Sequence, residues 1–186
     1  MVAALETQRL ILRAFRLSDT NAMAKINASK NVMRYFPEPY SQEKTKHFIE
    51  AVIAKYQRNQ PAVHACILKS NSVLIGSVGV TYQNFNAYFT PCYEIGWRLD
   101  DAYWHQGYAT EAAKTILTHY FQSLNFTEIL SYTPVINKAS IAVMESIGMQ
   151  HTGEYFNHTL LPLNHPLSKQ ILYRISAKQH VNKVKT

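Results

Sequence analysis

The sequence has few cysteines, no long apolar run and no internal repeat. Its two cysteines, Cys66 and Cys92, fall in predicted strands, and they provide neither a disulfide framework nor the paired spacing of a zinc site. No apolar run approaches the roughly 20 residues that a membrane-spanning helix needs. The opening segment, MVAALETQRL, lacks the charged region and the long apolar region of a signal peptide. We therefore expect a cytoplasmic protein that has no metal site and does not bind a membrane.

Charged residues are also sparse, at 17% of the chain, but their balance is basic, with a net charge of +7 and a pI near 9.4. Such a charge suits a polyanionic partner, a class that includes nucleotides, nucleic acids and acidic surfaces. The basic residues are scattered, however, and form neither an arginine-rich helix nor an aromatic-basic repeat. The charge therefore permits a nucleic-acid partner without requiring one.

The composition is that of a globular protein, because 47% of the 186 residues are apolar and a chain of this length can bury a core. We expect a single domain over residues 1–178 and a basic C-terminal tail over residues 179–186. The tail belongs to the densest basic cluster, Lys178 to Lys185, which we expect to be solvated and frayed.

Hydrophobic periodicity predicts the following elements: strand 9–13, helix 18–28 capped by Ser18 or Asp19, helix 41–58 capped by Ser41, strands 62–68, 73–82 and 93–99, helix 107–124, strand 128–133, helix 137–147 ending at Gly148, and strands 150–160 and 169–175. Both hairpins and β-α-β passages occur in this order, so we expect a mixed sheet with locally parallel strands at its centre. Gly76 and Gly79, inside one predicted strand, indicate a bulge or a close backbone approach.

Residues 93–113 are predicted to form a strand, a polar turn, a tight loop and the start of an amphipathic helix. A helix N-terminus has unpaired backbone N–H groups and a partial positive charge, which together favour an anion. Gly107 lets the backbone approach such an anion, and Ala109 is the next smallest residue of the loop. The same pattern occurs in α/β proteins whose loops bind nothing, so the rest of the chain has to distinguish the two interpretations.

Three motifs, taken in order, resemble the GNAT superfamily of acetyl-CoA-dependent N-acetyltransferases. They are ETQRLILRAFRLSD near the N-terminus, EIGW followed by YWHQGYATEA in the middle, and NKAS followed by ESIGM near the end of the chain. Within the superfamily they are similar to the branch of ribosomal-protein N-terminal acetyltransferases (RimJ/RimL-like). The resemblance implies an α+β (mixed α/β) fold, the GNAT acyl-CoA N-acyltransferase fold, with a mixed central sheet of about seven strands flanked by about four helices.

The resemblance also implies where acetyl-CoA, the cosubstrate, would bind. Residues 104–109 correspond to the pyrophosphate loop, whose backbone N–H groups come from Gln106, Gly107, Tyr108, Ala109 and Thr110. Trp104 replaces the superfamily's usual Gln or Arg, and His105 replaces the branch's usual Gly. Because the expected contacts are made by the main chain, His105 is tolerated if its backbone angles are ordinary; a phosphate contact and an exposed loop histidine are both open.

Further site residues follow from the same resemblance. The main-chain groups of Trp97 and Leu99 are expected to pair with the pantetheine arm of the coenzyme. Asn137 and Ser140 are expected near the thioester end, although Asn137 is also a good helix cap in the absence of any ligand. No metal is implied.

Acetyl transfer to an amine needs a base that takes a proton from the ammonium group and an acid for the leaving thiolate. Glu94 is the candidate base, because burial in an apolar strand raises the pKa of a carboxyl group. The alternative is a structural glutamate that is paired with a neighbouring Arg or capped by the backbone. A backbone N–H near Ile95 to Trp97 is a candidate to polarise the thioester carbonyl. Ser140 is the candidate acid. Cys92 is interpreted as a buried filler rather than a nucleophile.

The sequence therefore predicts an enzyme that transfers acetyl from acetyl-CoA directly to a primary amine. In the family that the chain resembles, the segments that correspond to residues 34–41, 83–91 and 155–168 hold the acceptor. Few carboxylates occur in these segments here. This favours a peptide N-terminus or a small neutral amine over a polycationic acceptor. A catalytically inactive GNAT-fold protein that retains acetyl-CoA binding is the alternative. Oligomeric state is open, and a homodimer is one of the alternatives.

Overall fold

The computed structural model describes residues 4–159 and 161–184, with side chains as far as His180. Within these residues it has eight strands and five α-helices, with the strand order β1-β2-β3-β4-β5-β6-β8-β7. The strands are β1 (Leu5–Glu6), β2 (Leu10–Arg13), β3 (Val63–Leu68), β4 (Leu74–Gln83), β5 (Cys92–Leu99), β6 (Glu128–Pro134), β7 (Gln150–Asn157) and β8 (Lys169–Ser176). The helices are α1 (Thr20–Ala28), α2 (Gln42–Gln57), α3 (Tyr108–Ser123), α4 (Lys138–Ser146) and α5 (Ala177–Val184).

The chain forms two compact units. The first contains Met1–Val80 and Gly96–Ile116, and the second contains Thr81–Ile95 and Leu117–Thr186. The division passes through β4, β5 and α3, so each unit holds part of these three elements.

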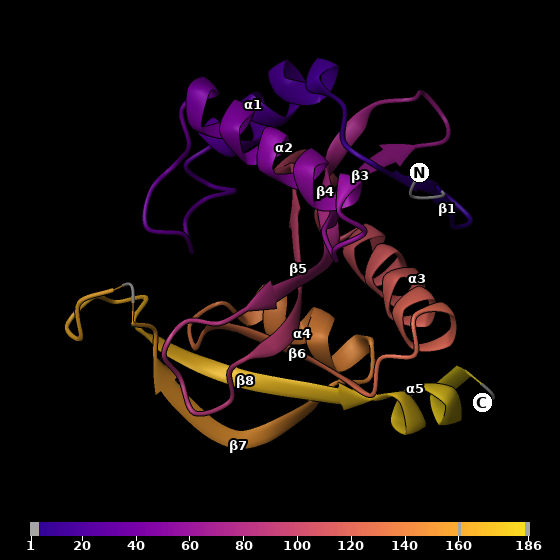
Figure 1. Ribbon diagram of the computed structural model, residues 1–186. Helices are drawn as coiled ribbons and strands as arrows, with labels where there is room; N and C mark the ends of the chain where they lie inside the picture. The colour runs from indigo at the N-terminus through magenta and orange to yellow at the C-terminus, as the bar shows by residue number, and fades with distance from the viewer. Residues whose placement is uncertain (1–3, 160, 185–186) are drawn as a thin grey trace. The chain divides into compact units, whose positions relative to one another are not determined.

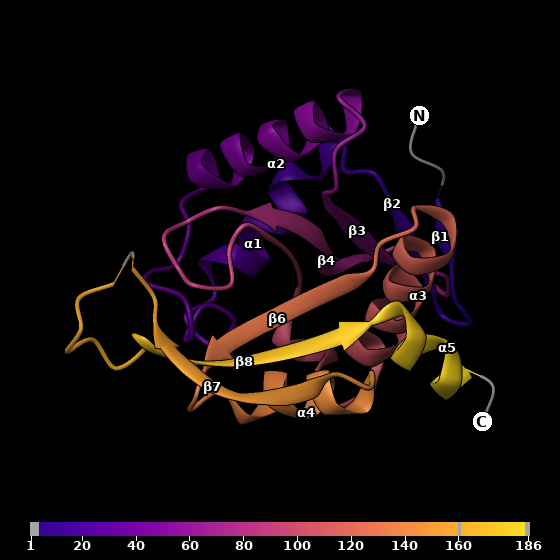
Figure 2. The ribbon, with the colours of Figure 1, turned by 60° about the horizontal axis from the view of Figure 1, so that its bottom comes forward.

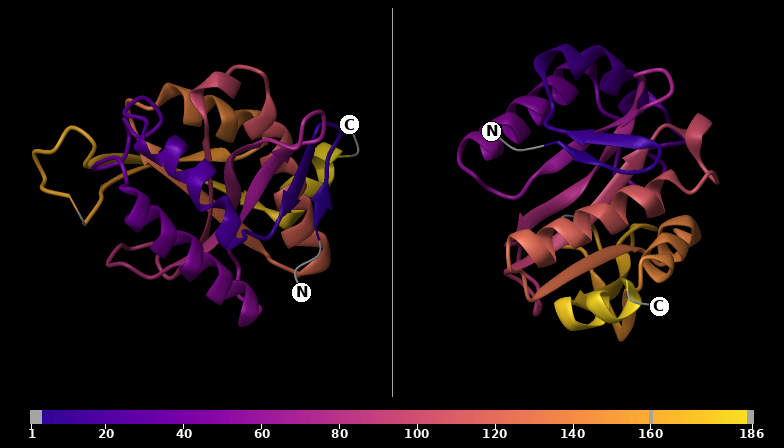
Figure 3. Two further views of the ribbon diagram at one scale, coloured as in Figure 1. Left: turned by 90° about the horizontal axis from the view of Figure 1, so that it is seen from above. Right: turned by 90° about the vertical axis from the view of Figure 1, so that its right-hand side faces the viewer.

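In the first unit, β1, β2, β3 and the start of β4 are antiparallel neighbours. The short hairpin of β1 and β2 is visible in the right-hand view of Figure 3. Helices α1 and α2 lie side by side (Figure 1) and pack against β3. The core between them is built from apolar side chains that include Phe15, Met23, Ile26, Ile49, Val52, Ala65 and Ile67.

The two N-terminal helices begin differently. The Ser41 hydroxyl accepts a hydrogen bond from the backbone N–H of Lys44 at 3.1 Å, which confirms the predicted cap of α2. Asp19 makes no side-chain cap on α1. Its carboxylate instead binds Arg13 at 2.7 Å and accepts from the backbone N–H of Arg16 at 2.8 Å. Asp19 therefore fastens the start of the first helical region to β2.

Both glycines inside β4 occur where another backbone comes close. A Cβ atom at Gly76 would stand 2.1 Å from the carbonyl oxygen of Arg98, and one at Gly79 would stand 2.4 Å from Cα of Val63. The register of β3 and β4 also shifts between Cys66 and Ile67. The predicted bulge and the predicted close approach are both confirmed.

In the second unit, β6, β8 and β7 run side by side (Figure 2) as antiparallel neighbours. The end of β5 that belongs to this unit pairs with β6 in parallel at Glu94 and Leu130, as predicted for the β-α-β passage through α3. The second predicted passage gives no direct parallel pair, because β8 lies between β6 and β7. Helix α4 ends before Gly148, whose φ of 92° confirms the predicted left-handed C-terminal residue.

The C-terminal region is more ordered in structure than the sequence suggested. Residues 177–184 form α5, in which the backbone N–H of Ala177 donates to Thr127 O at 2.9 Å. The His180 side chain is buried, and its Nε2 lies 2.8 Å from the Thr118 hydroxyl. The expectation of a frayed tail is therefore wrong for α5. The lysines of this segment indicate a solvated chain end, but the buried His180 side chain packs against α3 and holds the helix there. Residues 185–186 of the predicted tail lie outside the described residues.

The predicted order of elements and the mixed α/β fold class are confirmed. The described chain has eight strands instead of about seven, because of the two-residue strand β1, and five helices instead of about four, because of α5. Strand β7 ends at Asn157, and Leu160, the predicted end of that strand, lies outside the described residues.

Two kinds of feature are absent from the described residues, a helix that could span a membrane and a cluster of side chains that could bind a metal. None of their helices combines the length and the apolar character that a membrane span requires. None of their His, Cys, Asp and Glu side chains gather in threes in a way that could hold a metal ion. The expected single domain over residues 1–178 stays a prediction.

Candidate functional site

The loop before α3 has two residues in the left-handed region of backbone conformation. His105 has a φ of 58° and Gly107 a φ of 81°, with Gln106 between them. Helix α3 then begins at Tyr108. In the described chain the backbone N–H groups of Tyr108, Ala109 and Thr110 donate to no protein acceptor. These free donors, together with the absence of a side chain at Gly107, fit a phosphate group at the helix N-terminus.

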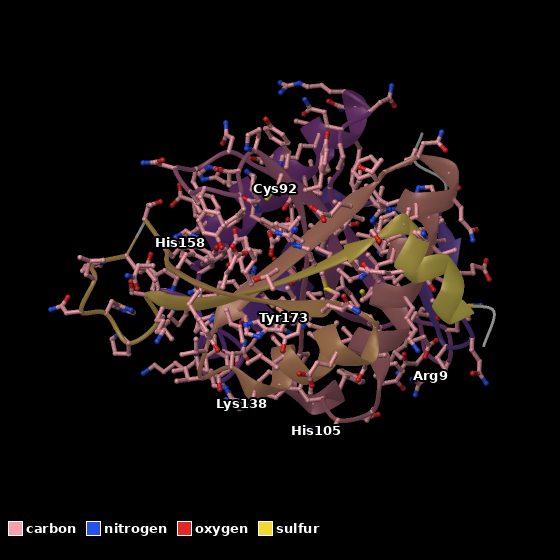
Figure 4. The ribbon with its side chains drawn as sticks, turned by 90° about the horizontal axis from the view of Figure 1, so that it is seen from below. Arg9, Cys92, His105, Lys138, His158 and Tyr173 are labelled. Atoms are coloured by element: carbon pink, nitrogen blue, oxygen red, sulfur yellow. The ribbon has the colours of Figure 1, made fainter. Side chains whose placement is uncertain are left out.

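The condition under which His105 would be tolerated, ordinary backbone angles, is not met, because its φ is 58°. A left-handed conformation costs a residue with a Cβ atom about 1–2 kcal/mol, which explains why the resembling branch usually has glycine at this position. His105 is exposed, and Figure 4 labels it together with Arg9. The backbone of this loop is therefore strained at His105. The expectation that main-chain contacts alone would make the histidine acceptable did not include this strain.

Replacing His105 with glycine should remove that strain. Part of the gain is offset by the larger conformational entropy of glycine in the unfolded chain, so we expect the free energy of unfolding to rise by up to about 1 kcal/mol. Urea denaturation of the two proteins measures this difference. Gln106→Gly is the control, since Gln106 has no positive φ and its replacement should lower stability. A drop in stability for His105→Gly would contradict the assignment of strain.

The carboxylate of Glu111 lies in the first turn of α3, where its charge could compete with a bound anion. Three groups hold it: the Thr7 hydroxyl, the backbone N–H of Arg9 at 2.8 Å and Arg9 Nε at 2.6 Å. Burial alone would raise the pKa of Glu111, but these hydrogen bonds outweigh it and lower the pKa, so the group is ionised at neutral pH. The negative charge of Glu111 is therefore bound by Thr7 and Arg9.

The part of β5 in the first unit carries Trp97, Arg98 and Leu99. Trp104, at the start of the loop, donates its indole N–H to the Leu99 carbonyl at 2.8 Å. This contact ties the loop to the strand and gives Trp104 a structural reason to replace the superfamily's Gln or Arg. A carbonyl oxygen has two lone pairs, so Leu99 keeps one for a further donor.

Arg98 is a half-buried arginine that sequence reasoning did not identify. Its Nη1 donates to Asn27 Oδ1 at 2.7 Å, and its guanidinium carbon lies 4.3 Å from the ring centre of Phe36 and 5.0 Å from that of Tyr40. Burial lowers the pKa of Arg98, and no carboxylate in the described residues pairs with it. Cation–π contacts therefore fasten residues 34–41, one of the predicted acceptor segments, to β5.

The second unit contains Glu94, on the end of β5 that pairs with β6. Gln83 Nε2 donates to Glu94 Oε2 at 2.9 Å and lies 3.0 Å from the Thr81 hydroxyl. Burial raises the pKa of Glu94 to about 7, against the opposing effect of hydrogen bonds from Gln83 and Thr81. No lysine or arginine in the described residues forms an ion pair with Glu94. The alternative in which Glu94 pairs with a neighbouring arginine is therefore not observed.

Two other titratable groups near Glu94 are neutral. Burial, aided by the charge of Glu94, raises the pKa of Cys92 to about 11, and the same two causes raise the pKa of Tyr132 well above its ordinary value. A thiol with so high a pKa is a poor nucleophile at neutral pH, because the thiolate is the reactive form. This agrees with interpreting Cys92 as a filler.

Tyr132, whose pKa is raised by burial and by the charge of Glu94, belongs to an aromatic cluster. Its members are Phe85, Phe89, Tyr132, Phe156 and His158. The rings of Phe85 and His158 stack at 4.8 Å, and those of Phe89 and Phe156 lie 4.8 Å apart edge to face. Each member is partly exposed, and Figure 4 labels His158. The cluster joins the predicted acceptor segments 83–91 and 155–168, and it contains no carboxylate.

Asn137 and Ser140 lie together at the start of α4. Asn137 Oδ1 accepts from the backbone N–H of Ser140 at 3.3 Å, which confirms the cap. Its Nδ2 donates to the Thr133 hydroxyl at 2.8 Å and to the Ser140 hydroxyl oxygen at 3.0 Å. The Ser140 oxygen is thus an acceptor here, and its hydrogen has no acceptor in the described residues. Asn137 therefore orients a hydroxyl that can still donate.

The structure groups the predicted site residues by unit. Trp97, Leu99 and the loop residues lie in the first unit, whereas Glu94, Asn137 and Ser140 lie in the second. Sequence reasoning missed Arg9 and Glu111 beside the loop and Gln83 beside Glu94. Both Arg9 and Glu111 stand inside quoted motifs, ETQRL and YATEA, so their place in those motifs was the available signal.

Comparison with known proteins identifies the family. Residues 9–150 match the model of the acetyltransferase (GNAT) domain. The chain belongs to the GNAT family of acetyltransferases. It is 34% identical over 148 residues to an uncharacterized N-acetyltransferase, YnaD, of Bacillus subtilis, a match that covers 79% of this chain and 82% of that protein.

Solved structures show the same fold. The crystal structure of a GNAT-family acetyltransferase from Bacillus anthracis has a TM-score of 0.79 and 27% identity to this acetyltransferase, and the match covers 95% of this chain and 99% of the other. RimL, the ribosomal L7/L12 alpha-N-protein acetyltransferase, solved in complex with coenzyme A, has a TM-score of 0.78 at 19% identity over 94% of this chain and 98% of its own. Similarity at the latter level shows a common fold.

Proposed function

We propose that this acetyltransferase moves an acetyl group directly from acetyl-CoA to a primary amine. The observation that carries the proposal is Glu94, a carboxyl group without an ion-pair partner in the described residues, whose pKa is raised to about 7. Such a group accepts a proton efficiently at neutral pH, since general-base catalysis is most effective when the pKa is near the working pH.

The loop at the start of α3 would hold the phosphates of acetyl-CoA. Its donors are the backbone N–H groups of Gln106, Gly107, Tyr108, Ala109 and Thr110, of which those from Tyr108 to Thr110 begin the helix. Main-chain groups of Trp97 and Leu99 would pair with the pantetheine arm. A backbone N–H between Ile95 and Trp97 would polarise the thioester carbonyl as negative charge develops on its oxygen. No metal has a part in this proposal.

The chemistry requires the removal of two protons from the amine nitrogen and the addition of one to the leaving thiolate. Glu94 accepts a proton from the acceptor ammonium, which leaves a neutral amine with a lone pair. The nitrogen then forms a bond to the acetyl carbon, and the carbon–sulfur bond breaks. Ser140 donates its hydroxyl proton to the departing thiolate. The second proton, which the nitrogen loses as the amide forms, passes through solvent to the Ser140 oxygen and restores its hydroxyl, and the proton taken by Glu94 returns to solvent. The oriented Ser140 hydroxyl, with an uncommitted hydrogen, supports this role.

Replacing Ser140 with alanine should lower kcat by about tenfold, because a serine is a weak acid and water can partly replace it. The helix cap should survive, since it uses the Ser140 backbone N–H. Steady-state kinetics at saturating acceptor measure the change, and a thermal melt checks the fold. An unchanged kcat would remove Ser140 from the mechanism.

The aromatic cluster that includes Tyr132 supports an uncharged or singly charged acceptor. A polycationic acceptor would need several carboxylates around the amine, and the acceptor segments 83–91 and 155–168 contain no Asp or Glu. RimL, whose name gives a protein α-amino group as its acceptor, has the same fold. We therefore propose a peptide N-terminus or a small neutral amine as the acceptor class.

A panel of peptides and small amines tests the proposal, with turnover read as free thiol released from acetyl-CoA. The expected result is amine-dependent thiol release with at least one α-amine. Acetyl-CoA binding without thiol release for any acceptor would favour the alternative, an inactive binding protein of the GNAT fold.

A further inference from the structure

Arg9 lies beside the proposed phosphate loop, although 102 positions separate it from its partner Glu111 in sequence. Its Nε donates to the Glu111 carboxylate at 2.6 Å, and its Nη1 donates to the Gln106 carbonyl at 2.9 Å. The guanidinium carbon also lies 4.2 Å from the ring centre of Tyr108. One side chain therefore contacts the loop, the first residue of α3 and the first turn of α3.

The contact with Gln106 falls where the loop is strained. Gln106 lies between His105 and Gly107, both of which have a positive φ. A strained conformation persists only where surrounding contacts hold it. The hydrogen bond from Arg9 to the Gln106 carbonyl is such a contact, because it fixes the peptide group that joins Gln106 to the left-handed residue Gly107.

The turn between β1 and β2 holds Arg9 in place. The backbone N–H of Thr7 donates to Leu10 O at 2.9 Å, and the Thr7 hydroxyl oxygen accepts from the backbone N–H of Leu10 at 2.8 Å. The Thr7 hydroxyl in turn donates to Glu111. The carboxylate is thereby bound by the turn as well as by the guanidinium, so the turn and the helix are fixed to each other.

The second amino group of Arg9 faces the loop. A Cβ atom built on Gly107 would stand 3.4 Å from Arg9 Nη2, and Nη2 has no hydrogen-bond acceptor in the described residues. The Arg9 side chain is 40% exposed. A donor with positive charge thus remains available beside the free N–H groups of the helix N-terminus.

We propose that Arg9 and Glu111 form a lock that positions the 104–109 loop for the phosphates of the coenzyme. Arg9 is a positioning residue: it holds the Gln106 peptide so that the helix N–H groups face the anion. Glu111 holds Arg9, and its own charge is compensated by Arg9 and Thr7. This inference rests on the proposed function, since it assigns the loop to the same coenzyme.

The sign of the Glu111→Gln effect separates this lock from a simple charge effect. Removing a negative charge at a helix N-terminus favours an anion there on electrostatic grounds alone. The lock predicts the opposite result, because a neutral glutamine holds the guanidinium less firmly. We expect coenzyme A to bind more weakly to Glu111→Gln than to the natural protein.

Calorimetric titration with coenzyme A is the main measurement. Hydrogen bonds to charged groups contribute enough to predict a Kd that is about ten- to hundredfold higher for Arg9→Met. Arg9→Lys keeps the charge but cannot make two bonds from a planar fork, so we expect a similar loss. Acetylpantetheine is an acetyl donor that lacks the pyrophosphate and the nucleotide. The kcat/KM for transfer from it should be the same in Arg9→Met, Arg9→Lys and Glu111→Gln as in the natural protein.

Arg13→Met is the matched control. Arg13 belongs to the same RLILR segment and also has an acidic partner, Asp19, but it makes no contact with the loop. Its replacement should lower the melting temperature without changing the Kd for coenzyme A. Equal Kd values for Arg9→Met and the natural protein, tighter binding by Glu111→Gln, or an equal loss with acetylpantetheine would each overturn the lock. Failure of the natural protein to bind coenzyme A would instead overturn the proposed function.

Discussion

Replacing Glu94 with glutamine should lower kcat/KM for the acceptor by about 10²–10⁴-fold, the usual contribution of a general base. Glutamine has nearly the same shape as glutamate, and its carbonyl oxygen can still accept the hydrogen bond from Gln83. It cannot accept a proton from the acceptor. The Kd for acetyl-CoA should therefore stay the same while turnover is lost, and titration calorimetry combined with steady-state kinetics measures both quantities.

Glu128→Gln is the control for this prediction. Glu128 is a carboxylate of β6 in the same unit, and it lies 3.8 Å from Arg174 at a position that is 43% exposed. Exposed ion pairs contribute little to stability, so this variant should keep its activity. Turnover of Glu94→Gln at the level of the natural protein would remove Glu94 as the base.

The pH dependence of turnover should show the same carboxyl group. Glu94 acts as a base only when it is ionised, and its pKa is about 7. Below this pH the ionised fraction falls about tenfold per pH unit, so kcat/KM should be about a hundredfold lower at pH 5 than on the plateau above pH 7. The acid limb should be absent from the residual activity of Glu94→Gln. An acid limb with an apparent pKa near 4.5, or one that persists in the variant, would contradict the assignment.

Unfolding provides the control for that profile, because it involves no acceptor. The folded protein keeps the Glu94 proton up to about pH 7, whereas the unfolded chain releases it near pH 4.5, so the folded state binds more protons between these values. The contribution of Glu94 to stability is therefore fully present below pH 4.5 and is lost as the pH rises through 7. Glu94→Gln should lack this decline. A loss of stability around pH 7 that is absent from Glu94→Gln would show that the group ionising near pH 7 belongs to the protein and not to the acceptor.

Much of the fold could be predicted because its signals are local. The Ser41 cap, the Gly148 terminus and the glycines of β4 each follow from backbone conformation or hydrogen bonding within a few residues. The helix α5 could not be predicted in the same way. Its lysines indicate a solvated end, and the contact that decides the outcome, His180 with Thr118, spans 62 positions.

The candidate site shows the same division. Burial of Glu94 within an apolar strand correctly predicted a raised pKa, whereas its catalytic role stays a proposal. The left-handed conformation of His105 could not be predicted from its side chain, because the loop and its contacts impose it. The pairing of Arg9 with Glu111 depends on how β1 and β2 reach α3. Both residues belong to motifs on which the family resemblance rests, but the motifs do not show that the two side chains contact each other.

Isotopically labelled acetyl-CoA tests the central claim most directly. The protein is incubated with coenzyme that carries label in the acetyl group and with a peptide that has a free α-amine, and mass spectrometry locates the label. Direct transfer predicts label in the peptide amide, none when the α-amine is blocked beforehand, and none on the protein. Label on Cys92, or label released only as free acetate, would contradict the account.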